Sequence, residues 1–264
     1  MRMRGSLFWG IVLIVLAVLL LASQQGWLKG DIFGYFWPAV IILLGLWLLT
    51  GPLLRRAPTT GGQSLSIPLE NARSARLKLD HGAGRLNIHS GAASGELLSG
   101  TFGMEVEQTT HMDGDQVQCK LRTSPHFWAW YPGENMDWDI HLNDSIPLYL
   151  KIDSGASATK MDLTDLKVVD LDIDTGASST EVTLPANAGN TRIDIDSGAA
   201  SLNLHIPAGV AASIRVKSGV ASVHVDPARF PHIEGPLYQS ADYATAANRA
   251  DITIDTGVGS VDIN

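Results

Sequence analysis

The sequence contains a motif that could place an acid for catalysis. Residues 174–177 read Asp-Thr-Gly-Ala, the tetrapeptide with which aspartic proteases hold a catalytic carboxylate at a tight turn. That chemistry needs two carboxylates that share one proton, with the second supplied by a facing lobe or by a second copy of the chain. The motif therefore predicts catalysis only if two copies of it can face each other.

The motif is one of several related copies, and their spacing indicates a structural repeat. The central glycines Gly155, Gly176, Gly198 and Gly219 are 21, 22 and 21 residues apart, a fixed period that is typical of stacked repeats. The copies are Asp80-His81-Gly82, Asp153-Ser154-Gly155, Asp174-Thr175-Gly176, Asp196-Ser197-Gly198, Lys217-Ser218-Gly219 and Asp255-Thr256-Gly257.

Apolar residues alternate with other residues on both sides of each central glycine. Leu171 and Ile173 precede Gly176 and Val182 follows it, and every other copy has Leu, Ile, Val or Met at these positions. This pattern predicts two half-buried strands joined by a bend, where we expect the glycine to adopt a positive φ. One unit cannot bury its apolar side alone. The sequence therefore predicts an all-β repeat domain, a β-solenoid-like stack of about six two-stranded units.

The stacking argues against a protease. Copies at this short spacing would lie side by side in one stack, whereas the protease dyad needs facing lobes. Asp172 and Asp194 also stand two residues before the motif aspartate, where aspartic proteases have an apolar residue. We therefore predict no enzyme activity, no catalytic residue and no cofactor. The residues assigned to structural turns are Asp153, Gly155, Asp174, Gly176, Asp196, Gly198, Gly219, Asp255 and Gly257.

A row of stacked aspartates must be stabilised in some way. Strands lie ~4.8 Å apart, and two unit charges at that distance repel by roughly 0.9 kcal/mol in water. Asp153, Asp174 and Asp196 would form such a row, which Lys217 could relieve. We favour structural Asx-turns, in which each carboxylate accepts backbone N–H groups. A weak cation site is the alternative.

Two insertions interrupt the period, near residues 95–145 and 228–250. The first holds a dense group of aromatic residues, which either covers the open end of the stack or forms an exposed binding site for a partner. The group consists of Phe127, Trp128, Trp130, Tyr131 and Trp138.

The histidines and the single cysteine show no spacing typical of a metal site. None of the 8 histidines stands at a sequence spacing from Cys119 that is typical of metal ligands, and we predict that the histidines are surface residues. One cysteine permits no internal disulfide bond, which fits a reducing compartment. No metal site is therefore predicted.

The N-terminal region has the composition of a membrane anchor. Residues 5–23 and 32–54 are apolar runs long enough to cross a bilayer, and we predict a two-helix transmembrane hairpin over 1–54, a linker over 55–66 and the β-repeat domain over 67–264. Arg2, Arg4, Arg55 and Arg56 flank the hairpin, so the positive-inside rule places both termini and the β domain in the cytoplasm. If the first run were a cleaved signal peptide, the remainder would be exported.

The charge balance excludes one class of partner. The chain carries 19 basic and 27 acidic residues, a net charge of -8. Several of the bases flank the predicted hairpin, so the β domain is more acidic still. Nucleic acid requires a basic surface, and we predict none as a ligand.

Specific stretches resemble known bacterial membrane proteins. Trp37-Pro38 and the run from Gly45 to Leu49 resemble the transmembrane region of LiaI/LiaF-like proteins, and residues 77–88 and 250–263 are similar to the toastrack β domain of LiaF-type and adhesin-type proteins. The resemblance implies a non-catalytic regulator or scaffold of the cell-envelope stress response. It also implies the bacterial cytoplasmic membrane as location and a membrane sensor histidine kinase as partner. The alternative is a surface-displayed, adhesin-like structural solenoid.

Overall fold

The computed structural model describes residues 62–124 and 136–264. The predicted hairpin and most of the linker lie outside this part of the chain. None of the described residues belongs to a helix that is long and apolar enough to cross a membrane. The first strand begins at Gln63, inside the range predicted as linker, so the linker prediction extends too far at that end.

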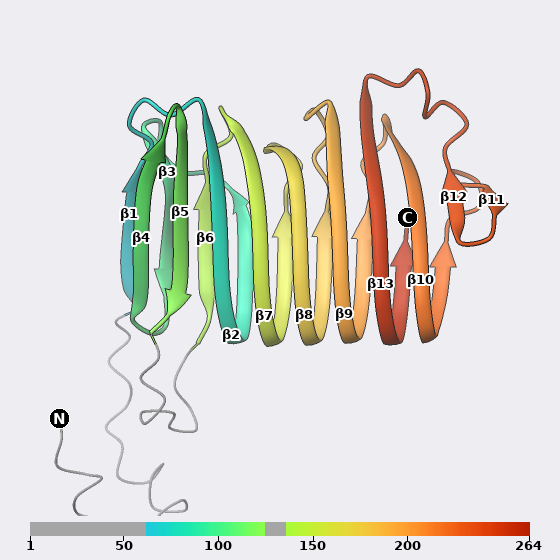
Figure 1. Cartoon of the computed structure of the whole chain (residues 1–264), viewed down its shortest axis with the longest axis horizontal. Coiled ribbons are helices and arrows are strands. Elements are labelled where there is room, and N and C mark those ends of the chain that lie inside the picture. The colour runs from blue at the N-terminus through green and yellow to red at the C-terminus, as the bar shows by residue number, and fades with distance from the viewer. Residues whose placement is uncertain (1–61, 125–135) are drawn as a thin grey trace, which may run out of the picture. The chain divides into compact units, whose positions relative to one another are not determined.

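The described residues form an all-β domain, as predicted (Figure 1). The sheet order is β1-β3-β6-β2-β7-β8-β9-β13-β10-β12-β11, and β5 pairs with both β2 and β4. The strands are β1 (Gln63–Pro68), β2 (Ser74–Ser90), β3 (Glu96–Phe102), β4 (Val106–Asp113), β5 (Gln116–Thr123), β6 (Trp138–Leu142), β7 (Pro147–Asp162), β8 (Lys167–Thr183), β9 (Asn190–His205), β10 (Val210–Val225), β11 (His232–Glu234), β12 (Leu237–Gln239) and β13 (Asn248–Ile263).

Each repeat is one long strand folded back on itself, where the sequence predicted two strands and a turn. The six strands β2, β7, β8, β9, β13 and β10 have 16 or 17 residues each and pair in parallel with their neighbours. The pairing of β7 with β8 passes through the bend, where it omits Gly155 and Gly176, and a bulge leaves Val169 of β8 without a partner near the start of the first arm. Figure 1 shows the folded strands side by side, each with two arms. The backbone ladder therefore continues around the bend.

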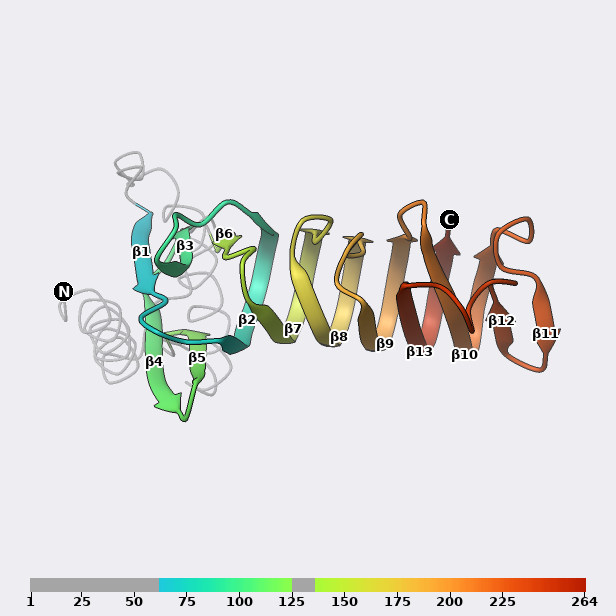
Figure 2. The same cartoon turned by 90° about the horizontal axis from the view of Figure 1, so that it is seen from above.

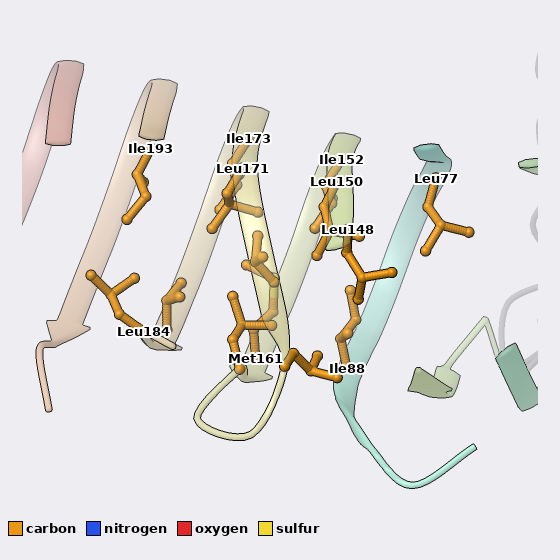
Figure 3. Close-up of a cluster of buried hydrophobic side chains, with 14 of the residues drawn as sticks. Leu77, Ile88, Leu148, Leu150, Ile152, Met161, Leu171, Ile173, Leu184 and Ile193 are labelled. Carbon is orange, nitrogen blue, oxygen red and sulfur yellow. The ribbon is translucent and has the colours of Figure 1, made fainter. Parts of the chain in front are cut away.

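The core lies between the two arms of the folded strands. In β7, Leu150 and Ile152 of the first arm and Met161 of the second arm are all buried, and Leu171 and Ile173 occupy the equivalent positions in β8 (Figure 3). Burial of these side chains contributes about 1.5–3 kcal/mol each. The alternation read from the sequence is therefore the alternation of one folded strand.

The C-terminal strand does not follow the sequence order of the stack. β13 lies between β9 and β10 and pairs in parallel with both, whereas the sequence predicted that Lys217 of β10 follows Asp196 of β9. The antiparallel β11–β12 pair covers part of the other edge of β10, through Ser213, Ile214 and Arg215. A covered edge does not offer free backbone groups to another chain.

The stack branches at β2. The first arm of β2 pairs with β5 through residues 74–80, and the second arm pairs with β6 through residues 86–90. Figure 2 shows β6 with β3 on one side of this end and β5 with β4 on the other. The first insertion therefore supplies separate neighbours for the two arms.

The repeat-centre glycines are required because of close packing, and the prediction of a positive φ there is wrong. Among the repeat strands, positive φ occurs at Gly84 (108°) and Gly259 (140°). A Cβ on Gly176 would lie 2.8 Å from the carbonyl oxygen of Gly155, and a Cβ on Gly198 would lie 2.8 Å from that of Gly176. Each glycine thus leaves room for the backbone of the preceding strand.

The glycine column gives a direct test. We expect Gly176→Ala to lower the free energy of unfolding by about 1–3 kcal/mol, because the added methyl group overpacks the bend. The matched control is Gly82→Ala, since a Cβ on Gly82 meets nothing within 4 Å. Thermal unfolding of the detergent-solubilised chain, followed by circular dichroism, measures both. Equal stability of the two variants would contradict this packing.

Candidate functional site

The motif residues form a single row on the outside of the stack. Register pairs Asp153 with Asp174, and Asp174 with Asp196, which confirms that these residues lie on neighbouring strands. The row continues from Asp80 at one end to Asp255 and Lys217 at the other. The copies lie in one line, without the facing arrangement of a protease dyad.

Lysines neutralise one end of this row. Lys78 Nζ lies 2.5 Å from Asp153 Oδ2 and 3.6 Å from Asp80 Oδ1, and Lys120 Nζ lies 2.8 Å from Asp80 Oδ2. Lys151 reaches Asp153 at 3.7 Å and Asp172 at 2.7 Å. The first two aspartates of the row are therefore held in a network of ion pairs.

The rest of the row has no such partners. Within residues 62–124 and 136–264, no hydrogen bond or ion pair joins the side chains of Asp174, Asp196 or Asp255 to another group. The predicted Asx-turns are therefore wrong at these positions. That geometry occurs instead just beyond strands, where the carboxylates of Asp162 and Asp226 accept the backbone N–H groups two residues later.

Ion pairing sets the protonation of Asp153 and Lys78. Partial burial pushes the pKa of Asp153 upward, but Lys78 and Lys151 outweigh it, and the pKa lies below its usual value of 3.8. The hydrogen bond to Asp153 raises the pKa of Lys78 above 10.5. Lys78 lies between Asp80 and Asp153, where the two carboxylates of a protease dyad would share a proton.

A cleft opens beside this network, and buried polar atoms line it. Its walls include Asp80, His81, Arg122, Asp153 and Ser154. His81 Nε2 donates to the carbonyl oxygen of Met136 at 3.1 Å, which leaves Nδ1 as an acceptor without a partner, and Ser154 Oγ also has none. Burial lowers the pKa of His81, so this imidazole is neutral. Such a polar pocket suits an ordered water molecule.

His81 and Ser154 do not form a nucleophile–base pair. The two residues are partners in the β2–β7 register, yet no hydrogen bond joins the imidazole to the hydroxyl. An activated serine needs that bond and a third group that orients the base. In this cleft the lysine-bridged aspartates lie on the outer row and do not orient His81.

Of the aromatic residues predicted to bind a partner, the structure describes Trp138. This residue is 1% exposed and packs edge-on against Phe102 and His81, with ring centroids 5.2 and 5.1 Å apart. Of the two alternatives for the aromatic group, the burial of Trp138 agrees with a cover over the end of the stack and contradicts an exposed binding residue. Phe127, Trp128, Trp130 and Tyr131 lie outside the described residues.

Sequence reasoning missed one cluster of possible ligands. His89, Asp139 and His141 have ligand atoms that all lie within 4.8 Å of one another. Asp139 and His141 alternate on β6, which is a detectable signal, but the pairing of β6 with His89 of β2 is not visible in the sequence. The prediction that the histidines are surface residues is wrong for His81, which is 2% exposed, whereas His89 and His141 are partly exposed.

Because lysines neutralise only one end of the aspartate row, substitutions at that end and farther along the row should change the free energy of unfolding in opposite directions. Asp153→Asn should lower the free energy of unfolding by up to about 1 kcal/mol, because it breaks the ion pairs with Lys78 and Lys151. Asp196→Asn, at the same repeat position, should raise it by up to about 1 kcal/mol, because it removes repulsion from Asp174 and Asp255. Chemical denaturation at low salt measures both changes.

Salt and acid provide the controls for this pair. Both changes should shrink at high ionic strength, where surface charges are screened. Because the pKa of Asp153 is lowered in the folded state, its stabilisation is present above pH 3.8 and is lost as the pH falls through the lower folded value. Changes of the same sign in the two variants would contradict the assignment.

Comparison with known proteins places this architecture in a family. Residues 7–49 match the LiaI-LiaF-like transmembrane region, and residues 56–205 match the N-terminal domain of toast_rack. No curated protein matches the chain. Its fold is similar to a crystal structure from Clostridium sporogenes described as "a putative cell adhesion protein", with a TM-score of 0.70 and 20% identity over 77% of this chain and 98% of that one. The chain belongs to the toast_rack family and is anchored to a membrane by a LiaI-LiaF-like region.

Proposed function

We propose that this protein is a non-catalytic regulator or scaffold of the bacterial cell-envelope stress response. Its hairpin anchors it in the cytoplasmic membrane, and its β domain lies in the cytoplasm and binds a membrane sensor histidine kinase. The match of residues 7–49 to a LiaI-LiaF-like transmembrane region supports the anchor. The charge pattern of the β domain supports binding between proteins.

The observation that carries the proposal is an acidic face on the first arms of β8, β9 and β13. Its carboxylates point outward from neighbouring strands, and the bases on these arms are Lys167, Arg192 and Arg249, of which Arg192 lies 2.7 Å from Asp194. The acidic face consists of Asp170, Asp172, Asp174, Asp194, Asp196, Asp251 and Asp255. In-register strands hold these charges at fixed spacing, which favours docking of a complementary rigid surface.

The location of the domain suggests the chemistry of the partner. Cytoplasmic segments next to transmembrane helices are rich in Lys and Arg, so a membrane kinase offers basic surface close to its helices. The same acidic face is repelled by the anionic inner leaflet. Complementarity therefore favours a protein partner over the lipid surface for this face, while the hairpin contacts the bilayer.

The geometry of the aspartates supports a role without catalysis. Lys78 and Lys120 neutralise two of the three carboxylates that line the cleft, at 2.5 Å from Asp153 and 2.8 Å from Asp80. In the described part of the chain, the remaining carboxylates of the row are separated by strand spacing and face solvent. Such an array can bind a basic surface and is a poor proton donor.

An adhesin-like structural protein is the second candidate. The likeness to the Clostridium sporogenes cell adhesion structure favours it, although at 20% identity this likeness concerns the fold alone. An adhesin must be exported, whereas the arginines around the hairpin favour a cytoplasmic domain. The side of the membrane on which the β domain lies therefore separates the two candidates.

The single cysteine makes a topology experiment practicable. Cys119 is 2% exposed, and burial raises the pKa of its thiol, so the native chain should react slowly with maleimides. In cells that carry the full-length Asn203→Cys variant, a membrane-impermeant maleimide should label the exposed new thiol only after permeabilisation. The unsubstituted chain is the control. Labelling of intact cells would place the domain outside and favour the adhesin.

Site-specific photocrosslinking tests the partner. A photoreactive amino acid at Thr253, on the acidic face, should crosslink a sensor histidine kinase in native membranes, and one at Asn203, on the outside of the second arms, should not. The combined Asp174→Asn, Asp196→Asn and Asp255→Asn variant should reduce the adduct at least threefold by loss of charge complementarity. Mass spectrometry identifies the adduct. Absence of a kinase adduct at Thr253 would contradict the proposal.

A further inference from the structure

A cluster of metal-ligating side chains lies where the stack branches, apart from the acidic face. His89 near the end of β2 is the register partner of His141 in β6, and Asp139 precedes His141 by two residues on the same side of that strand. The ligand atoms of the three residues lie within 4.8 Å of one another, and all three side chains are partly exposed. Two imidazoles and one carboxylate suit a first-row transition-metal dication.

Both ring nitrogens of His89 lie within hydrogen-bond distance of an oxygen acceptor. Its Nδ1 lies 3.0 Å from the carbonyl oxygen of Ser90, and its Nε2 lies 3.1 Å from Asp139 Oδ1. Both oxygens are acceptors, but a neutral imidazole has only one N–H to donate. Either Nε2–H donates to Asp139 and Nδ1 faces the Ser90 oxygen with no proton between them, or Nδ1–H donates to Ser90 while Nε2 and Asp139 bind the same cation.

The second arrangement is common around bound metals. A metal-ligating histidine usually donates its other N–H to a carbonyl or carboxylate, which orients the ring and fixes the tautomer. The contact between His89 Nδ1 and Ser90 supplies that orientation. Asp162 of β7 is the register partner of His89 on the other side. Its Oδ1 accepts hydrogen bonds from the backbone N–H and the hydroxyl of Thr164, so Asp162 is not counted in the cluster.

His141 is placed to complete the site. Its ring lies edge-on to that of His89, with centroids 4.0 Å apart. Within the described ranges, no hydrogen bond occupies its ring nitrogens, so a lone pair is available for a metal. Gly91 leaves room for the ring on one side, since a Cβ there would lie 3.2 Å from His141 Nδ1.

We propose that His89, Asp139 and His141 form a binding site for a divalent transition metal of the zinc class. The three ligands come from two hydrogen-bonded strands, so little movement is needed to bind. Three protein ligands leave a fourth position of a tetrahedral ion open to water or to a group on a partner. The bound metal joins β2 to β6 at the branch point and stabilises the covered end of the stack.

Calorimetric titration of the full-length chain with zinc chloride tests the site. The chain is purified in detergent with a tag that contains no histidine. We expect one saturable site per chain and a higher melting temperature when zinc is present. His141→Gln and Asp139→Asn should each weaken binding at least tenfold, because two ligands hold the ion less tightly than three. Cobalt substitution should add visible absorption bands typical of nitrogen and oxygen ligands.

The matched control is His205→Gln, which removes an exposed histidine of β9 whose Nδ1 bonds to Asn264 Oδ1 at 2.7 Å. This variant should bind zinc as the unsubstituted chain does. Equal affinity in all variants would assign the zinc to another place and overturn the proposal. Absence of saturable binding would also overturn it and leave His89 hydrogen-bonded to Asp139.

Discussion

The close approach of backbone at the bend is the constraint on which the rest of the domain depends. The carbonyl oxygen of one central glycine closely approaches the central glycine of the next folded strand. A Cβ on Gly155 would lie 2.7 Å from such an oxygen, and a Cβ on Gly257 would lie 2.5 Å from one. Only glycine permits this contact without displacement of the backbone. Because the strands stay in contact at the bend, the parallel ladder runs through both arms and the register is the same on each.

That common register decides where the charges lie. A residue at a given distance from the central glycine sits directly beside its equivalent in the next strand, so a repeated aspartate becomes a row of aspartates. Isolated carboxylates at strand spacing repel one another, and the stack relieves this only where β2, β5 and β7 contribute lysines. The acidic face is thus a consequence of repetition, kept at some cost in stability, as expected of a binding surface.

The sequence predicted the features that depend on local periodicity. The alternation around Gly176 located the buried residues, and the spacing of the glycines placed Asp153, Asp174 and Asp196 on neighbouring strands. Features that depend on distant pairing were missed: the position of β13 between β9 and β10, the burial of Trp138, and the meeting of His89 with His141. A positive φ at the glycines was a reasonable expectation from one unit, but the packing between units is what requires glycine there.

Chemistry that a regular stack cannot produce becomes possible at its branched end. Inside the stack, each side chain meets only its own equivalents, so charges of one kind gather and different ligands rarely converge. At β2 the first arm meets β5, which brings Lys120 and Arg122 to Asp80, and the second arm meets β6, which brings Asp139 and His141 to His89. The insertion between β2 and β7 supplies both neighbours. The regular strands thus present a uniformly acidic face, while the irregular end collects mixed side chains, which is why the two proposed sites differ in chemistry.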